Sequence, residues 1–228
     1  MIEACETNER MSQLRGLLYQ SPSDGAWREL CRLLYTWPSG EGLEVAIEYC
    51  GSLLERWPDA QRRALGSWWR ALDDERYAML WPLVRSFQIW YGDLGDAGAA
   101  RLATCPLMAH LTHLDLSVNG ITDEGAIELS MSPFLGRLTH LDLSVNEIGD
   151  GACIELLVAP GLPSLEHLNL QKNRISELGA SLLAESPQLA RLGSLRMAGN
   201  PTGPGGAEAL ERSVYLAPGA RQGLFEKV

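Results

Sequence analysis

The sequence predicts an α/β protein in which a short solenoid of five 27-residue repeats follows an all-α N-terminal region. Between residues 84 and 213, apolar residues recur in the pattern L-x-x-L-x-L, which begins again every 27 residues without insertion. Residues 1–83 lack this alternation and contain six of the chain's seven tryptophans. A period of this length is typical of stacked units, none of which buries a core alone.

The N-terminal region, residues 1–83, is predicted to be helical. Three of its segments end alike, with a leucine pair followed closely by proline, and a helix does not readily continue through the residue before proline. Ser23 or Asp24, and Asp59, are suitable starts. The region is interpreted either as a cap over the open core of the first repeat or as an independent module that binds a partner. The expected helices cover residues 6–20, 24–37, 41–57, 59–72 and 74–80.

Each repeat of the second region, residues 84–213, begins with a short predicted strand. Alternate apolar side chains of L-x-x-L-x-L point inward, and the intervening ones point out. An asparagine follows each strand where the chain turns away, and its side-chain amide is suited to satisfy backbone groups of neighbouring turns. The predicted asparagine ladder consists of Asn119, Asn146, Asn173 and Asn200.

A helix is predicted after each strand. Asp123 and Asp150 are the expected N-cap residues, and the segment from Gly125 onward has the small and apolar spacing of a helix that packs on the strand layer. The last copy carries glycine and proline over 201–206 instead, so we expect it to be the terminal repeat. Residues 214–228 are then a C-terminal cap or tail.

These residues resemble the leucine-rich-repeat family. Four in-phase copies of L-x-x-L-x-L-x-x-N carry the resemblance, and the N-x-I-x-D-x-G-A segment is similar to the ribonuclease-inhibitor-like subfamily of the bacterial type. The resemblance covers residues 84–213. It implies a short horseshoe arc with parallel strands on the concave face and helices on the convex face, and it implies that the concave face binds another protein.

Composition excludes several classes of protein. A net charge of −10 argues against a general nucleic-acid binder, which needs basic surface. No apolar run approaches the ~18–20 residues that cross a bilayer, and the polar N-terminus lacks the features of a signal peptide. Five scattered cysteines without C-x-x-C spacing indicate neither a disulfide framework nor a zinc site. We therefore expect a cytoplasmic protein that binds neither nucleic acid nor a membrane.

The outward strand positions and the adjoining rim form the predicted binding surface. Trp90 and Tyr91 are aromatic anchors where other repeats have smaller residues, although packing under the helical region is an equal alternative. Charge changes along the array from acidic to basic, which favours a partner of complementary polarity. The predicted partner-binding residues are Gln88, Trp90, Tyr91, His113, Asp115, Val118, His140, Asp142, Val145, His167, Asn169, Lys172 and Arg196.

Three histidines, His113, His140 and His167, fall at the same position of successive strands. Adjacent strands lie about 4.8 Å apart, so the imidazoles are expected to be neighbours. A flat ladder does not converge on a tetrahedral or octahedral point, and we expect no metal site. A binding face that responds to pH and a simple relic of the repeat consensus both remain open.

No catalytic residues or cofactor are expected. The glycine-rich segment 199–206 follows a strand but lacks the GK[ST] ending of a phosphate loop and keeps the repeat register. Cys31, Cys50 and Cys153 sit in apolar helical contexts, and Cys5 has no visible base. The predicted function is non-catalytic protein–protein interaction, as a scaffold or adaptor. The alternative is a regulator or inhibitor of a partner enzyme such as a small GTPase or nuclease.

Overall fold

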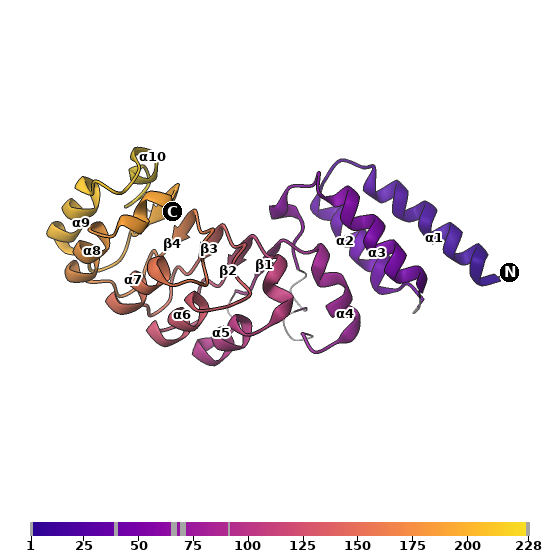
Figure 1. The fold of residues 1–228 in the computed structure, drawn as a ribbon, viewed down its shortest axis with the longest axis horizontal. Helices are drawn as coiled ribbons and strands as arrows, with labels where there is room; N and C mark the ends of the chain where they lie inside the picture. The colour runs from indigo at the N-terminus through magenta and orange to yellow at the C-terminus, as the bar shows by residue number, and fades with distance from the viewer. Residues whose placement is uncertain (1, 39–40, 65–67, 69–71, 91, 227–228) are drawn as a thin grey trace. The chain divides into compact units, whose positions relative to one another are not determined.

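The computed structural model describes residues 2–38, 41–64, 68, 72–90 and 92–226. The chain divides into two compact units, Met1–Phe87 and Gln88–Val228 (Figure 1). Among the described residues, no helix combines the length and the apolar character that crossing a membrane requires.

The first unit is a helical bundle around buried tryptophans. Trp27, Trp37 and Trp81 are almost completely buried, and α1 packs against both α2 and α3. Ser23 is the N-cap of α2, because its hydroxyl accepts a hydrogen bond from the Ala26 N–H at 3.2 Å. The helices are α1 (Ile2–Leu18), α2 (Asp24–Tyr35), α3 (Glu41–Leu54) and α4 (Glu75–Leu80).

The helix expected over 59–72 is wrong in the described part of that segment. Its described start forms a 3₁₀ turn, η1 (Asp59–Gln61), in place of an α-helix. The backbone then extends and pairs in parallel with the strand that follows this unit's helices, with the Ala64 N–H donating to the Ser86 carbonyl at 2.8 Å. The buried Arg62 guanidinium holds the segment by donating to the Leu83 carbonyl at 2.8 Å. This pairing gives hydrogen-bond partners to backbone groups at the open edge of the strand that contains Ser86. A helix over this segment would leave those groups without partners.

The second unit confirms the predicted solenoid. A single parallel sheet carries the strands in the order in which they occur in the sequence. Leu114 pairs with Leu141, and Leu168 pairs with Leu195, so the paired residues are one 27-residue period apart and all are buried. The strands are β1 (Ser86–Gln88), β2 (His113–Asp115), β3 (His140–Asp142), β4 (His167–Asn169) and β5 (Ser194–Arg196).

Helices line the opposite face of this unit from the strands (Figure 1). Each helix from α5 to α9 packs against the next one along the chain. These helices are α5 (Gly95–Ala103), α6 (Asp123–Ser130), α7 (Asp150–Val158), α8 (Glu177–Ala184) and α9 (Gly203–Arg212). Shorter turns are η3 (Trp81–Leu83) in the first unit, and η4 (Pro106–His110), η5 (Pro187–Arg191) and α10 (Pro218–Arg221) in the second.

The N-caps of α6 and α7 differ from the prediction. Thr122 and Gly149 are the cap residues, whereas Asp123 and Asp150 are the first residues inside the helices. Each aspartate instead reaches the following repeat. The Asp123 carboxylate accepts from the Gly149 N–H, and the Asp150 carboxylate accepts from the Ser176 N–H at 2.7 Å. For these carboxylates, an N–H at the start of the next helix is a better partner than an N–H of their own turn. The carboxylate there also interacts favourably with the positive end of that helix's dipole.

The asparagine of each repeat connects its own turn to the turn of the preceding repeat. Asn146 accepts through Oδ1 from the N–H groups of Asn119 and Ile121 at 3.0 and 3.1 Å. Its Nδ2 donates to the carbonyls of Leu116 and Leu143, each at 3.0 Å. The same arrangement recurs at Asn173 and Asn200, and Asn119 receives the Gly92 N–H. Backbone groups at each turn are thus satisfied by a side chain of the next repeat.

The described C-terminal residues, 214–226, pack on the last repeats but form no further strand. Leu216 and Leu224 are buried, and the Leu224 carbonyl accepts from the Met197 N–H at 2.7 Å. The Gln171 side chain donates to the Glu226 carbonyl at 2.7 Å. Backbone groups at the edge of β5 therefore find partners in this segment.

Candidate functional site

The outward side chains of β1–β5, termed here the strand face, place the three histidines in a stack. The ring centroids of His113 and His140 are 4.0 Å apart, and those of His140 and His167 are also 4.0 Å apart. The interplanar angles are 13° and 22°, so the rings lie nearly parallel. The strand register brings these residues together, and their half-buried edges remain accessible to a ligand.

The residue before the central histidine contacts its ring. The Thr139 hydroxyl lies 3.0 Å from the Thr112 carbonyl and 2.9 Å from His140 Nδ1, within hydrogen-bond distance of both. The Thr112 carbonyl also accepts the N–H groups of Thr139 and His140. Burial, then the neighbouring His113 and His167, lower the pKa of His140 to about 4. The centre of the stack is therefore uncharged at neutral pH.

Two aspartates run beside the histidines on the same face. The Asp115 carboxylate accepts from Gln88 Nε2 at 2.6 Å, from Trp90 Nε1 at 2.9 Å and from the Ser117 N–H at 3.0 Å. Trp90 is 60% exposed, so its indole lies on the surface and is oriented by Asp115.

The second aspartate, Asp142, is held by the same kind of contacts. Its carboxylate accepts from the Ser144 N–H at 2.8 Å, from the Ser144 hydroxyl at 2.6 Å and from Asn169 Nδ2 at 2.8 Å. Asp115 and Asp142 are directly paired in the sheet register, so two carboxylates stand side by side. Arg196, the equivalent residue on β5, is exposed and brings the opposite charge to that end of the face.

A rim of residues in left-handed backbone conformation borders the strand face. Val118, Val145 and Lys172 have φ angles of 60°, 56° and 54°, and the equivalent Gly199 has a φ of 81°. Such angles are strained for a β-branched residue, by about 1–2 kcal/mol each. Val145 nevertheless exposes 40% of its surface. Tyr91, which occupies the same repeat position, lies outside the described residues.

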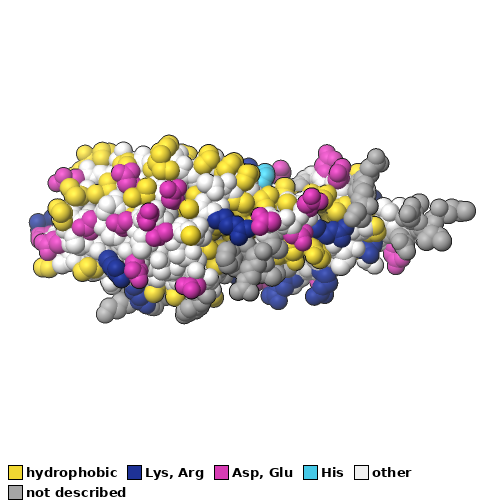
Figure 2. All heavy atoms as spheres, turned by 90° about the horizontal axis from the view of Figure 1, so that it is seen from below, with side chains coloured by type: hydrophobic (Ala, Val, Ile, Leu, Met, Phe, Trp, Pro, Cys, Tyr) yellow, Lys and Arg dark blue, Asp and Glu magenta, His cyan; other side chains and the backbone are white. Residues whose placement is uncertain are grey.

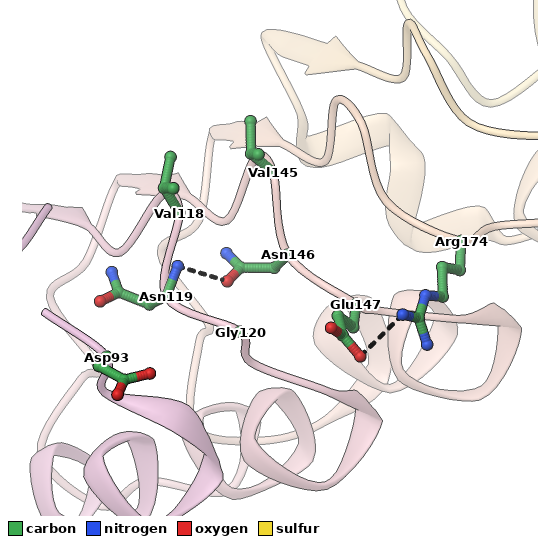
Figure 3. A pocket seen from close by; sticks show the side chains of 8 residues that line it. All are labelled: Asp93, Val118, Asn119, Gly120, Val145, Asn146, Glu147 and Arg174. Atoms are coloured by element: carbon green, nitrogen blue, oxygen red, sulfur yellow. Dashed lines mark hydrogen bonds and ion pairs between the residues drawn. The ribbon is translucent and has the colours of Figure 1, made fainter. Parts of the chain in front are cut away.

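Below this rim lies an open pocket of about 500 Å³ (Figure 3). Figure 3 shows Asn119 and Asn146 along its inner wall and the Glu147–Arg174 ion pair at its far end, with an N–O distance of 2.9 Å. The two valines point upward, away from the pocket floor. Its lining residues are Asp93, Val118, Asn119, Gly120, Val145, Asn146, Glu147 and Arg174.

Metal binding and thiol chemistry find no support among the residues that the structure describes. No group of three or more histidine, cysteine, aspartate or glutamate side chains there is arranged to hold a metal ion. Burial raises the pKa of Cys50 to about 12, and burial with Asp150 and Asp123 nearby raises that of Cys153 to about 12. Thiols with such a pKa are protonated and unreactive at neutral pH.

Two features of the rim escape reasoning from the sequence. The bond between Trp90 and Asp115 joins different repeats, and neither residue alone indicates it. The sequence contains one indication of the left-handed angles: the last repeat has Gly199 at the position before Asn200. Because glycine adopts left-handed angles most readily, the equivalent position of the other repeats could have been expected to adopt them too.

Comparison with known proteins identifies the repeats. Residues 108–130, 138–157 and 161–184 match the family model described as Leucine Rich repeat. The chain has no match among curated proteins. The matched segments coincide with the second, third and fourth strand–helix units, whose register and asparagine hydrogen bonds are given above. Leucine-rich repeats typically form non-catalytic modules for protein–protein interaction. The chain therefore contains leucine-rich repeats, and its α/β part is a leucine-rich-repeat solenoid.

Proposed function

We propose that the strand face and its rim bind a protein partner, and that the protein acts as a scaffold or adaptor without catalysis. The observation that carries this proposal is the exposed apolar rim. Val118 and Val145 keep strained backbone angles, and the exposed Trp90 indole on the strand face is oriented by its hydrogen bond to Asp115. Strain of this kind is characteristic of functional sites, and exposed aromatic and aliphatic anchors are typical of binding hot spots.

The polar groups of the strand face favour a partner that is rich in hydrogen-bond donors. Asp115 and Asp142 carry negative charge, and the half-buried His140 lies beside them on the same face. A carboxylate accepts about four hydrogen bonds, and each aspartate receives three within the chain. Arginine and lysine side chains supply the donors and the charge that such a surface lacks. At the other end, Lys172 and Arg196 suit an acidic portion of the same partner.

Several finer assignments accompany this proposal. The helices that line the face opposite the strands support the ribonuclease-inhibitor-like type of repeat, and the bacterial type remains a prediction from the sequence. Free thiols at Cys31, Cys50, Cys105 and Cys153 support a reducing compartment such as the cytoplasm. Residues 1–83 as a cap or as a second module, 84–213 as the repeats and 214–228 as a C-terminal cap remain the proposed organisation.

The experiment is affinity purification with the full chain as bait, followed by titration of the purified partner. Trp90→Ala and Val145→Asn remove apolar contact area, and asparagine tolerates the left-handed backbone of Val145. Each variant is expected to weaken binding about tenfold or more, with an unchanged circular dichroism spectrum. Tyr19→Ala is the control, because Tyr19 is 76% exposed in the turn that follows α1 in the other unit.

Equal affinity for both rim variants and the wild type would refute the assignment of this face. A change in the partner's own reaction rate on binding would favour the alternative function, regulation of an enzyme. The two outcomes are separable, because the first concerns where the partner binds and the second what binding does.

A further inference from the structure

A second surface lies on the helices of the repeat unit, far from the strand face. Three successive helices each carry two apolar side chains that are one helical turn apart and at least partly exposed. Leu178 is 64% exposed, Met131 55% and Val158 47%, whereas Ile154 is half-buried. The pairs are Ile127 and Met131 at α6, Ile154 and Val158 on α7, and Leu178 and Leu182 on α8.

These pairs form one oblique stripe. Ile127 and Ile154 are one 27-residue period apart, so they are neighbours on packed helices, and Met131 and Val158 are related in the same way. The α8 pair is displaced by three positions toward the start of its helix, which keeps it on nearly the same side of the helix. With helix axes about 8–10 Å apart, the stripe runs roughly 20 Å across the three helices.

Acidic residues surround this stripe. The three helices, all of whose residues the structure describes, contain six aspartates and glutamates and neither lysine nor arginine. Glu124, Glu128 and Glu155 are exposed among them. Figure 2, which views the molecule from the side of these helices, shows acidic and hydrophobic side chains intermingled over the repeat region. The surface is therefore both apolar and strongly negative.

We propose that this helix face, defined by the stripe and its flanking glutamates, docks a basic amphipathic helix of a partner protein. The apolar stripe accepts the partner's apolar side chains, and the glutamates accept its lysine or arginine residues. A stripe of about 20 Å matches the length of roughly 13 helical residues. A second copy of this chain is disfavoured as the occupant, because it would bring glutamate against glutamate.

The test uses the full-length protein and a labelled synthetic helix of alternating leucine and lysine stripes, with fluorescence anisotropy as the readout. Two control peptides are a leucine–glutamate helix and a leucine–lysine peptide of the same composition in scrambled order. The basic amphipathic helix is expected to bind in the micromolar range and the controls at least about tenfold more weakly. Raising the salt concentration from low to about 1 M is expected to weaken binding, because exposed charges are then screened.

One pair of variants separates apolar contact from simple charge attraction. Val158→Glu adds a negative charge inside the stripe, and Val45→Glu adds the same charge at a valine that is 57% exposed on α3. The proposal expects Val158→Glu to weaken binding about tenfold and Val45→Glu to leave it unchanged. Glu128→Gln with Glu155→Gln is expected to reduce both the affinity and its salt dependence.

Three results would overturn the proposal. Binding that is unchanged or tightened by Val158→Glu would show that charge alone attracts the peptide. Equal binding of the scrambled peptide, or no binding of the amphipathic one at a concentration of hundreds of micromolar, would exclude a helix-docking stripe. Concentration-dependent dimerisation that Val158→Glu abolishes would assign the face to a second copy of the chain.

Discussion

Asp150 is expected to be one of the most important surface-accessible residues for stability. Its Oδ1 accepts from the Ser176 N–H at 2.7 Å, and its Oδ2 accepts from the Ser176 hydroxyl at 2.6 Å. Ser176 is in turn the N-cap of α8, with its hydroxyl accepting from the Leu178 N–H at 3.2 Å. One carboxylate of α7 thus orients the start of α8.

The perturbation is Asp150→Ala. A hydrogen bond to a charged group contributes about 1.5–3 kcal/mol, and partial exposure of this pair reduces that contribution. We therefore expect the free energy of unfolding to fall by about 2–3 kcal/mol, as measured by urea denaturation followed by far-UV circular dichroism. Glu155→Ala is the control on the same helix, because Glu155 is exposed and a change at such a site stays within about 0.5 kcal/mol.

A second substitution tests the same contact from the other side. A Cβ added at Gly179 would collide with Asp150 Oδ1, so Gly179→Ala is expected to destabilise although alanine favours helices. The double variant should lose less than the sum of the two single losses, because both remove one interaction. A loss below about 0.5 kcal/mol for Asp150→Ala, or strict additivity, would refute the role assigned to the carboxylate.

Three further results are expected. The pKa of His140 is lowered to about 4 in the folded state from its ordinary 6.5, so the unfolded chain binds more protons between these pH values. The free energy of unfolding should therefore fall by about 1 kcal/mol as the pH drops from 6.5 toward 4. His140→Gln should remove that part of the pH dependence in denaturation curves, and an unchanged curve would contradict it. Asn146→Ala should lower stability by about 3 kcal/mol, because it removes the partner of two N–H groups and of the Leu116 carbonyl, whereas Ser144→Ala should have a smaller effect in the same assay. Cys31 and Cys50 should resist a thiol-specific chromogenic reagent at pH 8 until urea unfolds the chain, because both are buried and burial raises the pKa of Cys50 to about 12; rapid labelling of the folded protein would contradict this.

The repeats were predictable because their register depends only on a period. Once Leu114, Leu141 and Leu168 are aligned, every outward position follows, and the histidine stack is a direct consequence of that alignment. The asparagine hydrogen bonds are of the same kind, since they join equivalent turns of successive units.

Other features depend on contacts that the period does not contain. Asp123 looks like an N-cap within its own repeat, but its carboxylate serves the next one, and that choice depends on how closely the helices approach. Residues 62–64 carry no strand pattern, and their extended form results from the free edge of β1. The left-handed angle of Val145 contradicts its intrinsic preference, so it is imposed by the packed turn around it.

The hydrogen bonds between repeats run in both directions and repeat at equivalent positions. Unit 138–164 meets both neighbours alike: the Ile121 N–H donates to Asn146 Oδ1 at one junction, and the Ile148 N–H donates to Asn173 Oδ1 at the other. Insertion or deletion of a whole interior unit therefore leaves equivalent hydrogen bonds at the new junctions. Insertion or deletion of a few residues within a unit instead disrupts the hydrogen bonds at both of its junctions. The C-terminal end differs, because Leu224 and Glu226 meet the last units through contacts that do not recur between the described interior units. Whole-unit duplication or deletion is therefore best tolerated in the middle of the solenoid, where the second, third and fourth units carry the stacked histidines.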